Sequence, residues 1–348
     1  AACLGMEAVA VVRLISEELH RCHRLVDVDG TKLVGGARLS AYRFSHALFH
    51  RYVYESLDQA ERGYLHQGIG EALESLHGAH DAECAHVRAH HFEMAGIAGK
   101  AIDCHVLAAG QAVQTCFHQD ALAHLERALE LLEQLPDAAE RVRRELEIRI
   151  ARASSLSVTK GFLAADVGED FLRTRELASQ AGSKTLECDA SIMLGLHHGF
   201  LQHPGPAIAC AVHAERLAKQ LGDADRITES MSIHGLSLVF AGRIGDAMAC
   251  LAPEAEIDDP CAAPPKLLSL GTDSLVAVLV WYATALGLHG LFDRAKHRCA
   301  QALERARRIE HPHSLAAALW HTSFAGLEQG RCEEAEPRID EMLRLGEQ

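Results

Sequence analysis

Apolar residues recur at helical spacing along most of the chain. Between residues 122 and 132, four leucines stand three or four positions apart, with charged residues between them. This spacing places the leucines on one face of a helix, and Pro136 marks its end. The same pattern predicts a second helix from about 138 to 157. Glycine and proline interrupt similar segments at intervals down the chain, so we expect a succession of helices joined by short turns.

One segment near the N-terminus departs from this pattern. Residues 27–44 hold the turn-forming pairs Asp29-Gly30 and Gly35-Gly36 next to short stretches with an extended pattern, which predicts a β-hairpin. Helices are predicted on either side of it. Helices followed by a two-stranded wing indicate a winged-helix portion. We therefore predict a winged-helix remnant with a connecting helix over 1–76, and a second region over 77–348.

The second region repeats one arrangement of small residues. A glycine is followed five positions later by an alanine four times, in the pairs Gly96/Ala101, Gly242/Ala247, Gly290/Ala295 and Gly330/Ala335. Another small residue stands twelve positions before the alanine in four units, as Ala89, Gly235, Ala283 and, before Ala207, Gly195. A third follows the alanine by seven positions, as Ala108 and Ala302. Self-similarity at a period of about forty residues is the signature of a repeat architecture.

The physical role of each repeated position follows from its size. A small residue on the first helix of a hairpin lets the second helix approach closely, and the alanine fills the contact from the other side. The glycine supplies a left-handed turn. Such a hairpin does not bury its apolar face alone, so neighbouring hairpins stack. The units resemble tetratricopeptide repeats, and we predict an all-α, tetratricopeptide-like α-solenoid with Trp281, Trp320 and Phe324 in its core.

Composition narrows the range of functions. Acidic residues exceed basic ones and the formal charge is −14, which argues against a nucleic-acid partner. The eleven cysteines include no Cys-x-x-Cys pair, so we expect free thiols and a cytoplasmic protein. The longest apolar run, 275–288, is too short to span a membrane. No cofactor is predicted, because the string Gly182-Ser183-Lys184-Thr185 lacks the upstream glycine of a phosphate-binding loop.

A group of histidines and one cysteine is the best candidate for a metal site. It consists of His77, His80, Cys84, His86, His90 and His91. His86 and His90 are four positions apart and would share one face of a helix, as metal-binding histidine pairs do. The region has no His-Glu-x-x-His motif, cysteine pair or clear carboxylate partner, and 23 histidines in the chain make chance groups common. We therefore favour packing roles over metal binding, with a metal-dependent hydrolase centred on His86 and His90 as an alternative.

Two stretches resemble a known protein family. Residues 42–48 (Tyr-Arg-Phe-Ser-His-Ala-Leu) and 54–57 (Tyr-Glu-Ser-Leu) resemble a motif of large bacterial signal-transduction ATPases of the STAND/AAA type. The stretch from Asp273 through Trp281 to His311 is similar to the repeat region of such ATPases when they are fused to class III adenylate or guanylate cyclase domains, or to kinase domains. LuxR-type transcription activators are close relatives. The resemblance implies that this chain is the non-catalytic C-terminal portion of a longer protein.

Together these observations predict a regulatory scaffold and not an enzyme. We expect a protein or peptide partner in the concave groove of the repeats, or intramolecular ATPase or cyclase domains, so that binding gates an upstream ATPase or cyclase. Basic residues near the predicted wing raise the alternative of DNA contact. Glu17 and Glu18 lie on the helix that would enter the DNA groove, so an intramolecular clamp is favoured. The repeat region of a LuxR-type activator is the second hypothesis.

Overall fold

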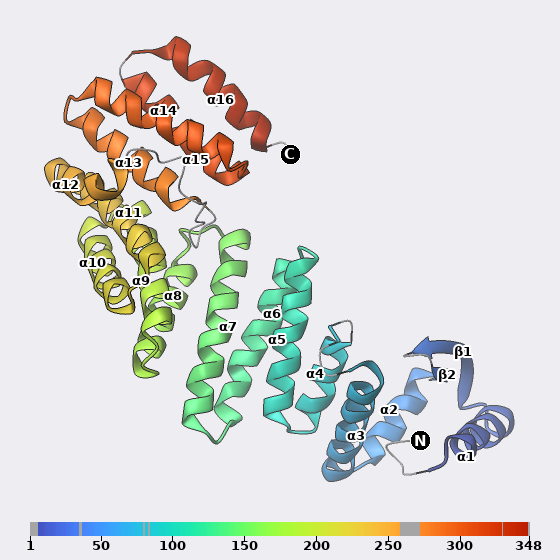
Figure 1. Ribbon diagram of the computed structural model, residues 1–348. Helices are drawn as coiled ribbons and strands as arrows, with labels where there is room; N and C mark the ends of the chain where they lie inside the picture. The colour runs from blue at the N-terminus through green and yellow to red at the C-terminus, as the bar shows by residue number, and fades with distance from the viewer. Residues whose placement is uncertain are drawn as a thin grey trace. The chain divides into compact units, whose positions relative to one another are not determined.

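The chain folds almost entirely into helices. The computed structural model describes residues 6–34, 37–78, 81–82, 84–257, 272–328 and 330–346. These residues form sixteen α-helices and one two-stranded sheet, which confirms the predicted all-α class with a small β-portion (Figure 1). Two compact units are present, Ala1–Thr159 and Lys160–Gln348.

The first unit holds the sheet and helices α1 to α7. Its elements are α1 (Ala8–Arg13), a π-helical stretch (Leu14–Cys22), β1 (Val26–Val34), β2 (Ala37–Phe44), α2 (Ala47–Ser56), α3 (Gln59–His77), α4 (Ala85–Met94), α5 (Ala98–Gln114), α6 (His118–Leu131), a 3₁₀ turn (Leu132–Gln134) and α7 (Ala138–Thr159). Strands β1 and β2 are antiparallel, and Val26 pairs with Phe44. They lie where the sequence predicts a hairpin. The assignment of this portion as a winged helix stays a prediction.

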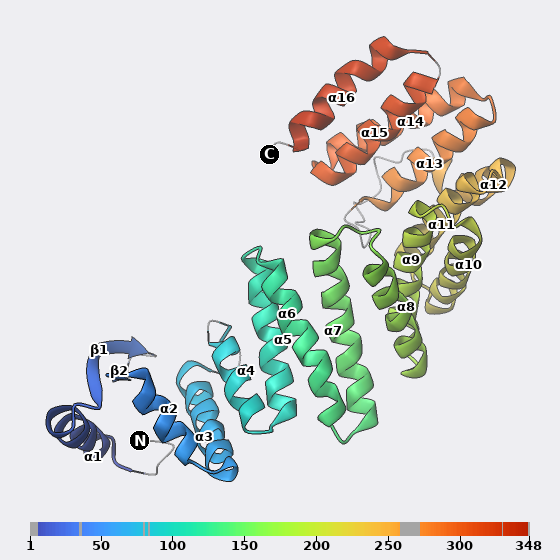
Figure 2. The same ribbon diagram turned by 180° about the vertical axis from the view of Figure 1, so that it is seen from behind.

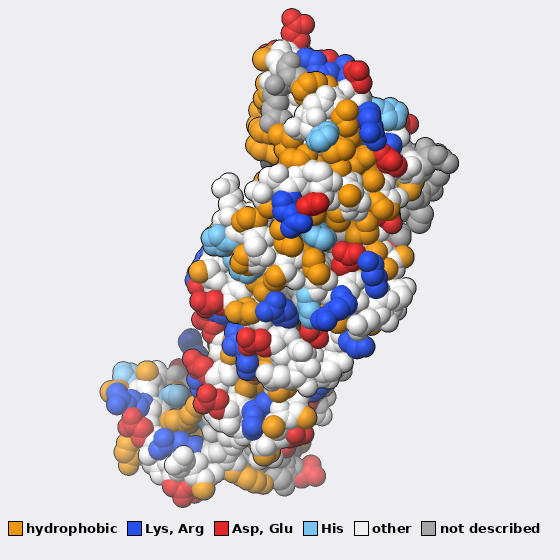
Figure 3. Space-filling model, turned by 90° about the vertical axis from the view of Figure 1, so that its left-hand side faces the viewer, with side chains coloured by type: hydrophobic (Ala, Val, Ile, Leu, Met, Phe, Trp, Pro, Cys, Tyr) orange, Lys and Arg blue, Asp and Glu red, His pale blue; other side chains and the backbone are white. Residues whose placement is uncertain are grey.

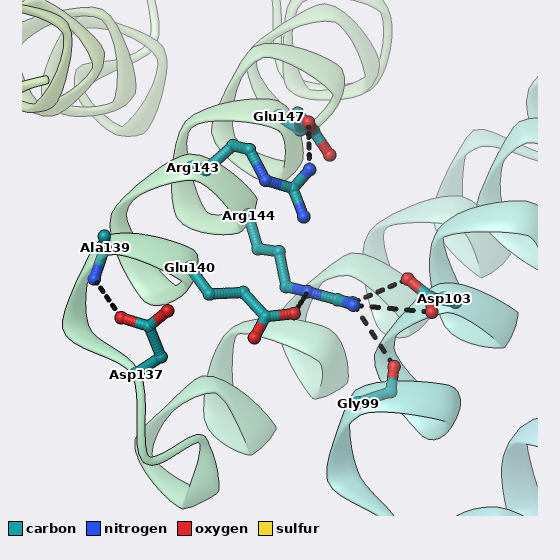
Figure 4. A network of polar contacts seen from close by, with 8 residues as sticks. All are labelled: Gly99, Asp103, Asp137, Ala139, Glu140, Arg143, Arg144 and Glu147. Carbon is teal, nitrogen blue, oxygen red and sulfur yellow. Dashed lines mark hydrogen bonds and ion pairs between the residues drawn. The ribbon is translucent and has the colours of Figure 1, made fainter.

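A polar network joins α7 to α5 in the first unit. Arg144 on α7 donates to the carboxylate of Asp103 at 2.6 Å and to the backbone oxygen of Gly99 at 3.2 Å, both on α5 (Figure 4). Its Nε donates to Glu140, one turn earlier on α7. The Arg144 side chain is only 12% exposed, whereas the Asp103 carboxylate, at 66%, stays in contact with solvent. The network therefore fixes how α7 lies against α5.

The second unit is built from helices that run antiparallel to their neighbours (Figure 2). Its elements are α8 (Ala165–Gln180), α9 (Lys184–Phe200), α10 (Pro204–Leu221), α11 (Ala224–Phe240), α12 (Ile244–Ala255), α13 (Ser274–Leu288), α14 (Phe292–Arg308), α15 (Pro312–Glu328) and α16 (Cys332–Gly346). Helix α11 contacts both α9 and α13, and α13 contacts α15. These four helices form a row that we call the inner row. Helices α10, α12 and α14 each bridge two of its members.

The small residues of the predicted repeat lie inside the hairpins. The positions on helices are all buried: Ala89, Ala101, Ala108, Gly195, Ala207, Gly235, Ala247, Ala283, Ala295, Ala302 and Ala335. The turn glycines, Gly96, Gly242, Gly290 and Gly330, have φ values between +70° and +87°. At Gly235 a Cβ would lie 2.5 Å from three side-chain atoms of Leu251, so glycine is needed for this approach of α11 to α12. Leu251, one turn after Ala247, therefore fills the space beside Gly235.

A buried ion pair fixes the start of α13. Arg305 on α14 donates through Nε and Nη2 to the two carboxylate oxygens of Asp273, at 2.6 and 2.7 Å. Both side chains are almost inaccessible to solvent. Asp273 also accepts from the backbone N–H of Val276 and so caps α13. Its own backbone N–H donates to Ser314 on α15 at 2.8 Å. Three helices are therefore tied together at this point.

Candidate functional site

An apolar groove lies on the inner row of the second unit. It has a volume of about 390 Å³ and is lined by residues of α9, α11, α13 and α15 and of the segments that precede α8 and α13. The lining residues are Phe162, Ile192, Leu196, Phe200, Glu229, Ser232, Ile233, Leu236, Thr272, Ala277, Val280, Trp281, His313, Ala317 and His321. Ligand pockets in proteins usually enclose about 300–1,000 Å³. The groove is therefore our candidate functional site.

Glycines on α9 bring the floor of the groove together. A Cβ at Gly199 would lie 2.6 Å from Cδ2 of Leu236, and a Cβ at Gly195 would lie 3.2 Å from Cγ2 of Ile233. Ile233 and Leu236 belong to α11 and are almost completely buried. Because no Cβ stands between the helices at these points, α11 packs its side chains against the backbone of α9. The floor is consequently a closely packed surface.

The serine hydroxyls of α11 are hydrogen-bonded within their own helix. Ser232 Oγ donates to the backbone oxygen of Glu229 at 2.8 Å, and Ser237 Oγ donates to that of Ile233 at 2.7 Å. Both side chains are buried. A hydroxyl hydrogen that is bonded in this way is not offered to a ligand. The floor therefore presents an apolar surface, although α11 is rich in serine.

One wall of the groove is aromatic. Trp281 on α13 lies edge to face with His321 on α15, and the ring centroids are 4.5 Å apart. The ring of Phe240 packs against Trp281 with centroids 5.6 Å apart. Burial lowers the pKa of His321 to about 4, so its imidazole is neutral near pH 7. This uncharged wall suits apolar and aromatic groups of a ligand.

Two of the three aromatic residues expected in the core are on the surface. Trp320 is 58% exposed and Phe324 is 48% exposed, so the sequence-based expectation is wrong for both. Trp281 is partly buried and lines the groove. Helices α13 and α15 carry apolar residues on more than one face. The spacing of these residues along the sequence therefore does not show which of them lie in the core, line the groove or face solvent. Figure 3 shows hydrophobic side chains gathered over the second unit on the face that it draws.

The histidines of the first unit pack mainly against one another. His90 lies edge-on to the rings of His66 and His91, with centroids 5.9 and 5.7 Å apart. His66 and His91 meet through their Nδ1 atoms at 2.8 Å, and burial, with the neighbouring His66, lowers the pKa of His91 to about 4. His86 lines a separate hollow of about 400 Å³ beside α5 and α6. His80 lies outside the described residues.

The structure brings together a different set of potential metal ligands. Nδ1 of His77 lies 3.0 Å from Oδ2 of Asp81 and 3.6 Å from Sγ of Cys84. His77 and Cys84 belong to the group singled out from the sequence. Asp81 was not singled out, because it lies in the turn between α3 and α4, where periodicity assigns no face to a side chain.

The structure also shows what surrounds Lys184 and how apolar the long helices are. Lys184 is the first residue of α9, and helix α8 precedes it where a phosphate-binding loop would follow a strand. Within the described ranges, none of the helices combines the length and the apolar character needed to cross a bilayer.

Comparisons with known proteins bear on the fold. No family model matches the chain, and no curated protein matches its sequence. Among solved structures, the apo form of RapI matches with a TM-score of 0.60 and 11% identity, over 86% of this chain and 79% of RapI. A Rap protein complexed with competence and sporulation factor matches with a TM-score of 0.48 and 12% identity, over 85% and 90% of the two chains. The Rap conjugation gene regulator of the plasmid pLS20, in complex with the Phr* peptide, matches with 0.48 and 14%, over 73% and 64%. The likeness to RapI shows a helical-repeat fold of that type.

Proposed function

We propose that the chain is a non-catalytic scaffold that binds an extended segment of a protein or peptide partner in the groove of the second unit. The observation that carries this proposal is the groove itself, which joins an apolar floor to an aromatic wall across four consecutive inner helices. A surface of this kind gains free energy mainly by excluding water from apolar contacts. The side chains that line the groove in the described part of the chain offer mainly apolar and aromatic contact surface.

The lining also defines the class of ligand. Histidines apart, the charged residue of the lining is Glu229, whose side chain is largely buried. A partner carboxylate would lose its hydration here and face a like charge. A partner segment with apolar or aromatic side chains is therefore favoured, and each such side chain adds roughly 1.5–3 kcal/mol when fully buried.

We further propose that binding in the groove controls a larger protein. Each hairpin of a repeat protein contacts only its neighbours, so a ligand that bridges several inner helices favours one packing of them over another. The resemblance of residues 42–57 and 273–311 to signalling ATPases supports the gating of an upstream ATPase or nucleotide cyclase. A LuxR-type activator is the alternative. A cyclase domain encoded before this region would support the first, and a helix-turn-helix domain encoded after it would support the second.

Peptide display against the full chain tests the groove. Peptides selected by the wild type should be rich in apolar and aromatic residues. They should bind the Ala317→Arg variant at least ~ten-fold more weakly than the wild type, because this change fills the groove with a charged side chain. The matched control is Trp320→Arg, on the same helix, at an exposed position that does not line the groove. Selected peptides that bind both variants as tightly as the wild type would place the binding surface elsewhere.

A further inference from the structure

Three different ligand types meet at the connection between α3 and α4. His77 is the last residue of α3, Asp81 lies in the turn, and Cys84 directly precedes α4. One ligand atom of each, a nitrogen, an oxygen and a sulfur, lies within 4.8 Å of the other two. The side chains of His77 and Asp81 are 21% and 23% exposed, so an ion from solvent has access to them.

Nδ1 of His77 is the atom that the other two ligand atoms approach. In one neutral tautomer of the imidazole this nitrogen carries a lone pair. A divalent cation between the three atoms would take that lone pair, the Asp81 carboxylate and the Cys84 thiolate as ligands. Imidazole, carboxylate and thiolate are the three ligand types that zinc binds in proteins.

The distances agree with a tetrahedral ion. With Zn–S of about 2.3 Å and with Zn–N and Zn–O of about 2.0 Å, a tetrahedral zinc separates sulfur from nitrogen by about 3.5 Å and nitrogen from oxygen by about 3.3 Å. The separation of Cys84 Sγ and His77 Nδ1 is 3.6 Å, and that of His77 Nδ1 and Asp81 Oδ2 is 3.0 Å. The separation of His77 Nδ1 and Asp81 Oδ2 has to increase by only about 0.3 Å to reach the value around zinc.

Arg88 holds the backbone on either side of these ligands. Gly78, with φ +89°, caps the end of α3, and its backbone N–H donates to the backbone oxygen of Glu74 at 2.8 Å. The guanidinium of Arg88, a residue only 1% exposed, donates to the backbone oxygens of Gly78 at 3.1 Å and Asp81 at 2.6 Å. Cys84 occupies the N-cap position of α4, where the helix dipole favours a thiolate. Arg88 thus ties the end of α3 to Asp81 and to α4.

We propose that His77, Asp81 and Cys84 bind a divalent transition-metal ion, with Zn²⁺ as the best fit and water as the fourth ligand. Nitrogen and sulfur donors exclude Mg²⁺ and Ca²⁺, which take oxygen ligands. Binding takes Cys84 as the thiolate, and its proton passes to solvent. The ion links the end of α3 to the start of α4. This site differs from the sequence-based alternative at His86 and His90, and it shares no residue with the groove of the second unit, so either proposal can fail alone.

Metal titration of the full chain tests the site. The reduced protein, stripped with a chelator, is titrated with Zn²⁺ by calorimetry and with Co²⁺ by absorption spectroscopy. We expect uptake of a single ion with sub-micromolar affinity, and a Co²⁺ spectrum with a thiolate charge-transfer band and the intense visible bands of tetrahedral geometry. His77→Ala and Asp81→Asn should each weaken Zn²⁺ binding by ~ten-fold or more. Cys84→Ser should abolish the charge-transfer band.

Matched variants separate this site from others. Cys116→Ser removes an exposed cysteine of the same unit, and His86→Ala removes a ligand of the sequence-based alternative; both variants should bind Zn²⁺ as the wild type does. Cys84→Asp keeps an anionic ligand and should retain Zn²⁺ binding without the charge-transfer band, which also shows that the chain tolerates a change at this position. Three results would overturn the proposal: no single-ion uptake by the wild type, a charge-transfer band that persists in Cys84→Ser, or loss of the metal in His86→Ala.

Discussion

At the residue scale, several buried histidines link stability to pH. The pKa values of His66, His91, His105, His124 and His321 are all lowered, with burial as the largest cause. These imidazoles stay neutral in the folded chain at pH values where the unfolded chain takes up protons. Because the unfolded state then binds more protons, their contribution to stability is complete above pH ~6.5 and is lost as the pH falls.

His321 offers the sharpest test of this linkage. Its pKa is lowered from 6.5 to about 4, so the free energy of unfolding should fall between these pH values. The slope from this one group approaches about 1.4 kcal/mol per pH unit. His321→Gln, which does not titrate, should reduce the slope by that amount in urea denaturation at a series of pH values. The same change at the exposed His289 serves as the control. If the free energy of unfolding depends on pH in His321→Gln as it does in the wild type, the lowered pKa of His321 is refuted.

The Asp273–Arg305 pair makes a second prediction at this scale. Asp273→Asn leaves the buried Arg305 without its counter-ion and should lower the free energy of unfolding by about 3–5 kcal/mol. Glu341→Gln breaks the exposed pair with Arg307 and should cost less than about 1 kcal/mol. Chemical denaturation of the two variants gives the comparison. Equal losses in the free energy of unfolding of the two variants would contradict a special contribution of the buried Asp273–Arg305 pair.

At the scale of elements, glycines decide how closely neighbouring helices approach. Gly195 and Gly199 let α11 lie against α9, and Gly235 lets α12 lie against α11. The contacts differ from those of an ordinary helix pair because one side contributes backbone and the other contributes a branched side chain. The hairpin geometry of the second unit thus depends on a few positions where any Cβ is in the way.

Gly235→Ala tests this dependence. The new Cβ would lie 2.5 Å from Cγ, Cδ1 and Cδ2 of Leu251, so the whole side chain has to move, and overpacking should cost about 1–3 kcal/mol. Gly245→Ala, in α12, is the matched control because a Cβ there meets open space. That change should stabilise the chain by up to ~1 kcal/mol through helix propensity. Thermal unfolding of both variants distinguishes clash from propensity, and a neutral Gly235→Ala would contradict the close approach.

At the scale of the whole molecule, the two compact units should lose structure separately. Repeat proteins draw their stability from contacts between neighbours, so damage in one unit spreads mainly within it. We expect Asp273→Asn to speed amide hydrogen exchange in α13, α14 and α15. Helices α4 to α7 should stay as protected from exchange as in the wild type. Exchange followed by mass spectrometry of peptides resolves the two regions. A uniform loss of protection would show that the chain unfolds as one body.

The sequence predicts the fold better than the site, for a physical reason. Helical spacing and the Gly/Ala pairs depend on local geometry and on contacts within one helical hairpin, so the fold class follows from them. The place of the β-hairpin at 27–44 follows from its turn-forming pairs, which are also local. The groove depends on contacts between hairpins, which spacing does not encode. Trp281 and Trp320 both lie on helices that carry many apolar residues, yet one lines the groove and the other faces solvent. Asp81 likewise meets His77 only because a glycine turn and Arg88 shape the connection.

The serines of α11 have a consequence for redesign of the groove. Since their hydroxyls are bonded within the helix, we expect engineered changes of the lining to be tolerated best at wall and edge positions such as Ala317 and His313. Floor residues such as Leu236 also pack against a glycine of the neighbouring helix, so a change there alters the lining and the helix packing together. Wall positions therefore offer a way to vary the surface while the framework of helices stays the same.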